Sequence, residues 1–486
     1  MILTLLALAL VHTPAASTRG LSQPVPSQPA ATTPGFDELF TGRTLRFDYV
    51  HTGTATEEHV APEDVRLEGP WPGSRTRLVD DTNLGKYLFE VVDRATNRVV
   101  YSRGFSSIYG EWETTGEAKR QWGTFHESAR FPEPRRTVQL VLKKRGDDGA
   151  FREIFSKELD PGGRFVDRSP LAPVGEVIRV IDNGPPATKV DLLILSAGYT
   201  ADERGKFEVD VGQSVNALFG TEPFASRRSD FNVRAVHVPS AQSGISNPRK
   251  GVWRDDPLGL SFNAFDSDRY VLTYANQALR DAAAQAPYDT LVMLFNDRKY
   301  GGGGIYGLWS TTAAGSAEAP YLFVHEFGHS FAGLADEYYS SQVSYEEYQA
   351  KGVEPWEPNA TALLDPENLK WGDLVEESTP LPTPWDQTGY DEVDVAYQKK
   401  RATLRARKAS EEEAEALFDE VRDTTRPMLE SQEHYGKVGA FEGAMYEAKG
   451  LYRPEVDCIM FTRNPTWFCR VCQRGIERVI DLYAGE

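Results

Sequence analysis

The sequence is poor in cysteine, in positive charge and in long apolar segments. Only three cysteines occur in 486 residues, Cys458, Cys469 and Cys472, which argues against a fold held together by disulfides. Lys and Arg number 53 against 72 Asp and Glu, and this net charge of −19 argues against a nucleic-acid partner. No apolar run reaches the roughly 20 residues of a membrane span. We therefore expect no membrane-embedded part.

The N-terminus carries the features of an export signal. Residues 1–17 read MILTLLALALVHTPAAS, a short apolar run followed by small residues, although no Lys or Arg precedes the run. Residues 18–35 are rich in Ser, Pro, Thr and Ala, which is typical of a flexible linker. We expect a signal peptide over 1–17 and a secreted, periplasmic or cell-surface protein.

Two different patterns follow the linker. From residue 36 to 170, short alternating segments such as YLFEVVD and TVQLVLKK are separated by Gly, Asp and Pro, which predicts an all-β sandwich accessory domain. A boundary is expected between Pro170 and Gly175. From 175 to 486, buried strands alternate with helices, which predicts a catalytic domain of the α/β or α+β class.

Several segments carry the α/β prediction. Strands are expected within residues 190–200, 231–239 and 288–296, and helices within 202–218 and 269–285. Residues 390–426 are dense in charge and predict an exposed, inserted helix pair, to which no chemistry is assigned.

The segment YLFVHEFGHSFAGLADEYY, residues 321–339, holds the candidate catalytic residues. On a helix His325 and His329 lie on one face and can bind one metal ion together. Glu326 lies beside the first ligand and can take a proton from a water that zinc has acidified. Gly333 is placed to end the helix with a left-handed residue.

A third metal ligand is expected just after this helix. Metzincin peptidases take it from the pattern HExxHxxGxxH or HExxHxxGxxD, but here the glycine comes one residue late and Ala335 occupies the usual slot. Asp336, one position further, is the predicted ligand, and Glu337 is the reserve. The alternative is that Asp336 caps a turn and Glu337 is a surface carboxylate.

Downstream segments make the resemblance specific. EVDCIMFTRN places Met460 in what looks like the Met-turn of metzincins, although Met is also a common core residue. Together with HEFGHSFAGLADEYY, VGAFEGAMYEAKGLYRP, FCRVC and KWGDLVEESTPLPTP, this segment resembles the IgA peptidase family of bacterial zinc metallopeptidases. Those proteins carry a similar β-rich domain before a metzincin-like catalytic domain.

The resemblance implies a zinc-dependent endopeptidase in which His325, His329 and Asp336 bind Zn²⁺ and Glu326 is the general base. The expected partners are protein or peptide substrates, with a host glycoprotein or immunoglobulin among the candidates. Immunoglobulin A itself is not implied, because neither fold nor motif fixes the target.

Other features leave alternatives open. The cysteines predict one local disulfide, Cys458 with Cys469 or Cys472, or instead a second zinc site for which no nearby His supplies a fourth ligand. GGGGIYGL, residues 301–308, is interpreted equally well as a substrate-binding edge strand or as a flexible loop. Tyr338 and Tyr452 are candidate donors to an oxyanion.

Two rival functions remain. The chain could be a non-catalytic binding protein with a vestigial zinc site, although intact His325, Glu326 and His329 count against this. It could also be a gluzincin-type peptidase with a distant Glu as third ligand; the candidates are Glu346, Glu347 and Glu354.

Overall fold

The computed structural model describes residues 35–340, 345, 349–407 and 409–485. The expected signal peptide and all of the expected linker except Gly35 lie outside these residues. Phe36–Glu486 forms one compact unit. Within the described ranges, no helix combines the length and apolar character needed to span a membrane. The division at Pro170 to Gly175 stays a prediction.

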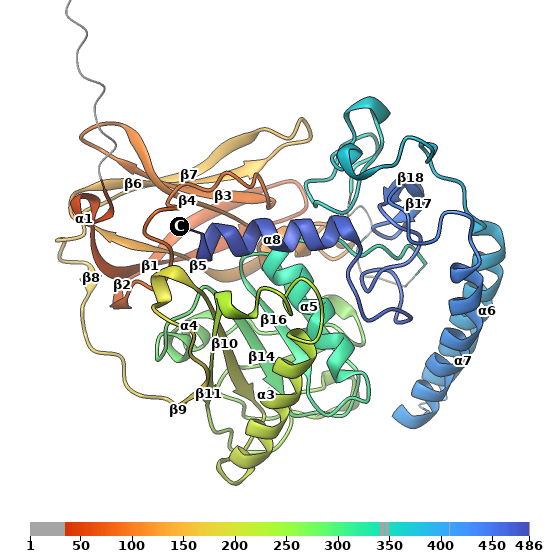
Figure 1. Ribbon diagram of the computed structural model, residues 1–486. Helices are drawn as coiled ribbons and strands as arrows, with labels where there is room; N and C mark the ends of the chain where they lie inside the picture. The colour runs from red at the N-terminus through yellow and green to blue at the C-terminus, as the bar shows by residue number, and fades with distance from the viewer. Residues whose placement is uncertain (1–34, 341–344, 346–348, 408, 486) are drawn as a thin grey trace, which may run out of the picture. The chain divides into compact units, whose positions relative to one another are not determined.

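The N-terminal part consists of two four-stranded sheets (Figure 1). One has the order β5-β1-β2-β8 and the other β4-β3-β6-β7, and all neighbours are antiparallel except β2 and β8. The elements are α1 (Phe36–Leu39), β1 (Phe40–Gly53), β2 (Glu58–Pro70), β3 (Tyr87–Asp93), β4 (Arg98–Phe105), α2 (Ile108–Trp112), β5 (Gly123–Pro134), β6 (Val138–Arg145), β7 (Phe151–Leu159) and β8 (Val166–Asp167).

Both sheets contribute to one apolar core, so this part is a β-sandwich. Phe47 and Phe131 come from the first sheet and Phe89 and Leu140 from the second, and all four are buried. The rings of Phe89 and Phe131 meet across the interface with centroids 6.3 Å apart. Side chains along β3 alternate between buried and partly buried, as the period of two in the sequence predicts.

The C-terminal part is built on a six-stranded sheet of order β15-β16-β14-β10-β11-β9. The four inner strands are parallel, and the edge strands β15 and β9 are antiparallel to their neighbours. The strands are β9 (Glu176–Ile181), β10 (Val190–Ala197), β11 (Phe231–His237), β14 (Thr290–Phe295), β15 (Gly302–Ile305) and β16 (Trp309–Ala313). Every residue of β10 is buried, as expected of a central strand.

Helices cover both faces of this sheet. The core on one face includes side chains of α3 (Arg204–Leu218), α5 (Ala319–Ala332) and α8 (Arg470–Ala484). The core on the other face includes α4 (Asn276–Ala283) and, from the N-terminal part, α2. The mixed α/β class is confirmed, and the sandwich packs its short helix α2 directly against the C-terminal part.

Two predicted segments differ in detail. Residues 269–285 hold a short strand, β13 (Val271–Leu272), which pairs with β12 (Ser261–Phe262), and α4 begins only at Asn276. Apolar residues 271 and 272 are buried strand residues rather than the first turn of a helix. The charged segment forms the predicted helix pair, α6 (Gln387–Ala406) and α7 (Glu411–Glu430), followed by the hairpin of β17 (Phe441–Ala444) and β18 (Glu447–Arg453).

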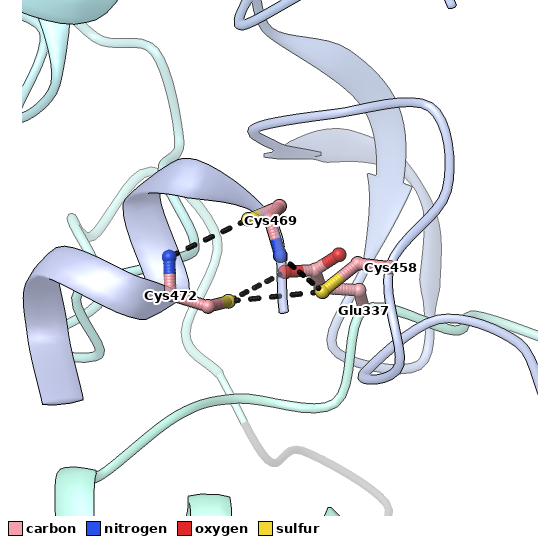
Figure 2. A group of neighbouring side chains, drawn as sticks. All are labelled: Glu337, Cys458, Cys469 and Cys472. Atoms are coloured by element: carbon pink, nitrogen blue, oxygen red, sulfur yellow. Dashed lines mark hydrogen bonds between the residues drawn. The ribbon is translucent and has the colours of Figure 1, made fainter. Parts of the chain in front are cut away.

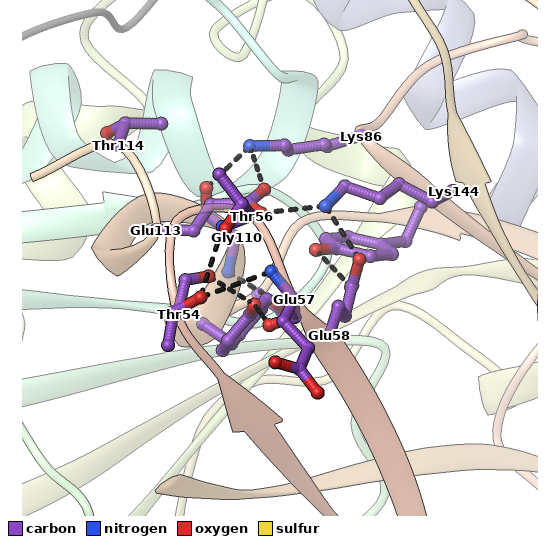
Figure 3. Close-up of polar contacts among 12 residues, drawn as sticks. Thr54, Thr56, Glu57, Glu58, Lys86, Gly110, Glu113, Thr114 and Lys144 are labelled. Atoms are coloured by element: carbon purple, nitrogen blue, oxygen red, sulfur yellow. Dashed lines mark hydrogen bonds and ion pairs between the residues drawn. The ribbon is translucent and has the colours of Figure 1, made fainter. Parts of the chain in front are cut away.

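A network of partly buried charges anchors the chain around α2 (Figure 3). Glu113, directly after α2, accepts from Lys86 Nζ at 2.6 Å and from Lys144 Nζ at 2.7 Å. Lys144 also pairs with Glu58 at 2.7 Å, and Lys86 donates to the carbonyl of Gly110. These contacts join α2 to strands β2 and β6 and set its position.

His51 extends this network into the core and carries a prediction. Its two ring nitrogens lie 3.0 Å from Glu127 Oε2 and 2.7 Å from Glu58 Oε1. Burial opposes its charge, but the two carboxylates raise the pKa of His51 from 6.5 to about 9. The charged ring therefore stabilises the fold fully below pH 6.5, and this contribution is lost as pH rises through about 9.

We expect His51→Gln to lower the free energy of unfolding by about 3 kcal/mol below pH 6.5, because it leaves the buried carboxylate of Glu127 without its charged partner. Above pH 9 the loss should be smaller. Urea unfolding at both pH values measures the difference. The control is His59→Gln, since His59 lies on the surface. An equal loss for His51→Gln at both pH values would contradict a charged ring.

Candidate active site

Helix α5 carries the histidine motif. Pro320 occupies its first turn, where a missing N–H costs nothing, and Gly333 ends it at φ 63° with its N–H bonded to the carbonyl of His329 at 3.0 Å. Phe327 and Phe331 stack on the buried side with ring centroids 5.0 Å apart. The opposite side of the helix is thereby left to the histidines.

Three candidate ligand atoms converge beside this helix. The Nε2 atoms of His325 and His329 lie 3.1 Å apart, and Oδ1 of Asp336 lies 3.1 Å from the first and 3.2 Å from the second. A tetrahedral ion with bonds of about 2.0–2.1 Å has ligand-to-ligand edges of about 3.3–3.4 Å. The three atoms therefore form nearly one face of such a tetrahedron.

Hydrogen bonds orient the lone pairs toward this point. Nδ1 of His325 lies 3.0 Å from the carbonyl of Ile459, and Nδ1 of His329 lies 2.6 Å from that of Leu334. Because a carbonyl only accepts, each Nδ1 carries the proton and each Nε2 presents its lone pair. Oδ1 of Asp336 is buried and receives no hydrogen bond among the described residues, while Tyr446 donates to Oδ2.

Three lone pairs that converge at one point favour a bound cation. Burial opposes a charged ring, yet the Asp336 carboxylate raises the pKa of His329 to about 9, so the surroundings of this point favour positive charge. The donor set of two imidazoles and one carboxylate is typical of catalytic zinc. The residues present therefore fit a divalent metal ion.

Glu326 lies at the rim of the same pocket and is partly buried. Burial raises the pKa of its carboxyl above the usual range, which brings the group closer to the pKa of an effective general base. Its Cγ is so close to strand β15 that a Cβ atom on Gly302 would lie 3.2 Å from it.

The glycines of β15 allow this close approach. A Cβ atom on Gly304 would lie only 2.4 Å from the carbonyl oxygen of Glu326, so no other residue fits there. The N–H of Gly302 donates to the backbone carbonyl of Arg269, on the side of β15 that faces away from β16. Because alternate residues point the same way, the backbone groups of Gly304 also face this outer side. Residues 302–305 form a strand, as one of the two interpretations predicts.

The turn at Met460 supports the helix from below. Met460 is fully buried, and its Sδ would lie 3.3 Å from a Cβ atom on Gly328, between the two histidines along α5. Its carbonyl accepts from the N–H of Glu337 at 2.8 Å. This is the position that the sequence predicts for a Met-turn.

The pocket around these groups has a volume of about 280 Å³ and includes residues that sequence reasoning missed. Glu111 of α2 lines it and accepts from the hydroxyls of Tyr270 and Tyr345. Burial raises the pKa of Glu111 to about 7. No sequence signal pointed to Glu111, because its role depends on α2 packing against the other part of the chain. Helices α6 and α7 also line the pocket with Arg401 and Phe418, so the inserted pair is more than a surface addition.

Other candidates lie elsewhere. The Glu337 carboxylate lies with the three cysteines and not with the histidines. Glu354 pairs with Lys370 and does not line the pocket, and Glu346 and Glu347 lie outside the described residues. Tyr338 lines the pocket and bonds to Asp336, whereas Tyr452 does not line it.

The predicted disulfide is wrong for the structure. Cys458, Cys469 and Cys472 are all free. The sulfur atoms of Cys458 and Cys472 lie 3.9 Å apart, well beyond the bond of about 2.05 Å. Cys472 Sγ also contacts Glu337 Oε1 at 3.3 Å.

Comparison with known families identifies the class and then the family. Residues 178–480 match the model described as IgA peptidase M64, and residues 35–156 match the M64 peptidase N-terminus. The chain is therefore a metallopeptidase. It belongs to the IgA peptidase M64 family. Comparison with curated proteins finds no match.

The predicted role of Asp336 can be tested by metal content. Asp336→Ala should lower zinc affinity at least about tenfold, because it removes one of three converging donors. Zinc retained after dialysis against a weak chelator measures the loss. Glu354→Ala is the control and should retain wild-type zinc. If instead Glu354→Ala loses the metal and Asp336→Ala keeps it, the third ligand is the distant glutamate.

Proposed function

We propose that this protein is an exported zinc endopeptidase, with His325, His329 and Asp336 as metal ligands and Glu326 as general base. The observation that carries the proposal is the convergence of three lone pairs within 3.2 Å of one another, in a pocket that Glu326 also lines. Two nitrogens and one oxygen leave a fourth tetrahedral position for water or substrate.

The chain's own residues then divide the work. A bound zinc ion would supply Lewis acidity to a substrate carbonyl and to an attacking water. Glu326 takes the proton of that water and later gives it to the leaving amine. Its raised pKa suits both steps, because the group must accept and then release a proton. Tyr338, beside Asp336, is the candidate donor to the developing oxyanion.

Strand β15 is the proposed site for the substrate main chain. Its outer edge lines the pocket, and Gly304 directs backbone groups toward it. An extended peptide could pair there by β-augmentation, which recognises backbone and so suits an endopeptidase. The natural substrate is proposed to be a protein, with host glycoproteins among the candidates.

Glu326→Gln tests the assigned base. The variant should keep its fold and its zinc, because the amide has the same shape and is not a ligand, but lose nearly all hydrolysis of casein or a mixed peptide library. Cleavage is followed by mass spectrometry with and without chelator. Activity within about tenfold of wild type would exclude Glu326 as the base. If the wild type binds zinc fully but hydrolyses no substrate, the result would favour the alternative of a non-catalytic binding protein.

The pocket also suggests a substrate preference for acidic side chains. Arg401 and Arg463 line it, and their Nη2 and Nη1 atoms respectively are buried without a hydrogen-bond partner among the described residues. Burial and the neighbouring charge of Arg269 lower the pKa of Arg401 to about 9. A substrate carboxylate would satisfy these two nitrogen atoms and offset the repulsion between the two arginines.

We expect peptides with Asp or Glu near the scissile bond to be cleaved preferentially. Arg401→Gln should lower kcat/KM for such peptides about tenfold relative to their Asn or Gln counterparts, the size of one charged hydrogen bond. The matched control is Arg405→Gln, on the same helix but exposed and outside the pocket. An unchanged ratio in Arg401→Gln would contradict the preference.

A further inference from the structure

A second cluster of potential ligands lies behind the active site. Glu337, Cys458, Cys469 and Cys472 are all at most 1% exposed (Figure 2). They come from three separate segments: the chain after α5, the turn before Met460, and the start of α8. Figure 2 shows the sulfur atoms of Cys458 and Cys472 directed toward the Glu337 carboxylate.

The spacing of these atoms is close to that of a coordination shell. One sulfur or carboxylate oxygen from each residue lies within 4.8 Å of all the others. Sγ of Cys458 and Cys472 are 3.9 Å apart, and Cys472 Sγ is 3.3 Å from Glu337 Oε1. Tetrahedral zinc with sulfur bonds of about 2.3 Å has sulfur-to-sulfur edges of about 3.8 Å.

Backbone groups favour thiolates at this place. The N–H of Cys469 points to Cys458 Sγ at 3.2 Å, and the N–H of Cys472 points to Cys469 Sγ at 3.4 Å. Cys469 is the N-cap of α8, a helix of 15 residues. The free N–H groups and the dipole at a helix N-terminus stabilise negative sulfur.

The carboxylate supplies an independent sign that a cation belongs here. Asn359 donates to Oε1 of Glu337 at 2.9 Å, but Oε2 is buried and has no partner among the described residues. The charge of the buried Arg453 acts on Glu337, but among the described residues the two form no ion pair within 4.0 Å. A buried carboxylate oxygen without a hydrogen-bond donor is costly, and a metal ion would satisfy it.

A disulfide explains this arrangement less well. It would use two sulfurs and leave both the third cysteine and the Glu337 carboxylate unexplained in the core. A metal ion uses all four groups at once. No histidine close to the cysteines in the sequence can supply a fourth ligand. Glu337 can supply it, although it lies 121 to 135 residues away from the cysteines along the chain.

We propose that Glu337, Cys458, Cys469 and Cys472 bind a structural zinc ion, separate from the catalytic metal. The ligand set is closed and fully buried, as in structural zinc sites, so the ion has no open position for water or substrate. Binding releases the thiol protons and joins the three segments.

The site adjoins the catalytic one through the chain. Glu337 follows Asp336, and Cys458 precedes Ile459, whose carbonyl orients His325. A metal that holds Glu337 and Cys458 therefore holds both segments that shape the catalytic ligands. Its proposed role is to keep the floor of the active site in place.

The experiment is metal analysis of the full-length protein with X-ray absorption at the zinc edge. The proposed catalytic ligands contain no sulfur, so a zinc–sulfur shell at about 2.3 Å reports the second site alone. We expect two zinc ions per chain and such a shell in the wild type. A variant with both His325→Ala and His329→Ala should retain one zinc with a larger sulfur contribution. This result would support the second site even if the proposed catalytic role failed.

Isosteric glutamate variants provide the matched pair. Glu337→Gln should lose the sulfur-bound zinc in competition with a chelator at least tenfold more readily than wild type. Glu326→Gln should not. Cys469→Ser should retain one zinc ion and lose much of the zinc–sulfur shell. If this variant fails to fold, the wild-type spectrum and Glu337→Gln still decide whether the second zinc site exists. A wild type with no zinc–sulfur shell would overturn the proposal, whether its cysteines are disulfide-bonded or free thiols.

Discussion

The hydrogen bond between His325 Nδ1 and the carbonyl of Ile459 is the contact on which the active site depends. It joins helix α5 to a turn 134 residues later in the chain and fixes which nitrogen of the ring faces the proposed metal position. The turn is held in its place because Met460 packs under α5 and its carbonyl binds the N–H of Glu337. The helix, the turn and the segment that carries Asp336 therefore form one connected unit.

The β-sandwich takes part in this arrangement. Its short helix α2 packs in the core on one face of the catalytic sheet and brings Glu111 into the pocket. The charges of Lys86 and Lys144 hold the end of α2 through Glu113. The N-terminal part therefore contributes the side chain of Glu111 to the pocket.

Local signals in the sequence were sufficient for much of the fold. The apolar run of 190–200 predicts a buried strand, and the His–Glu–His spacing predicts one metal-facing side of a helix; both depend only on periodicity. The place of Asp336 could be predicted because it follows a glycine that ends the helix. The sequence could not predict the roles of Glu111 and of Glu337 with the cysteines, because they depend on contacts between segments more than 100 residues apart. It could not predict the place of Arg401, because this depends on how the inserted helix pair folds back over the pocket.

The most direct test of the account is an anomalous difference map from crystals of the zinc-loaded protein, collected on both sides of the zinc absorption edge. The account predicts a strong peak about 2.0–2.2 Å from Nε2 of His325, Nε2 of His329 and a carboxylate oxygen of Asp336. A zinc peak that lies away from the two histidines would contradict the account. So would a peak beside them whose third protein ligand is a glutamate and not Asp336.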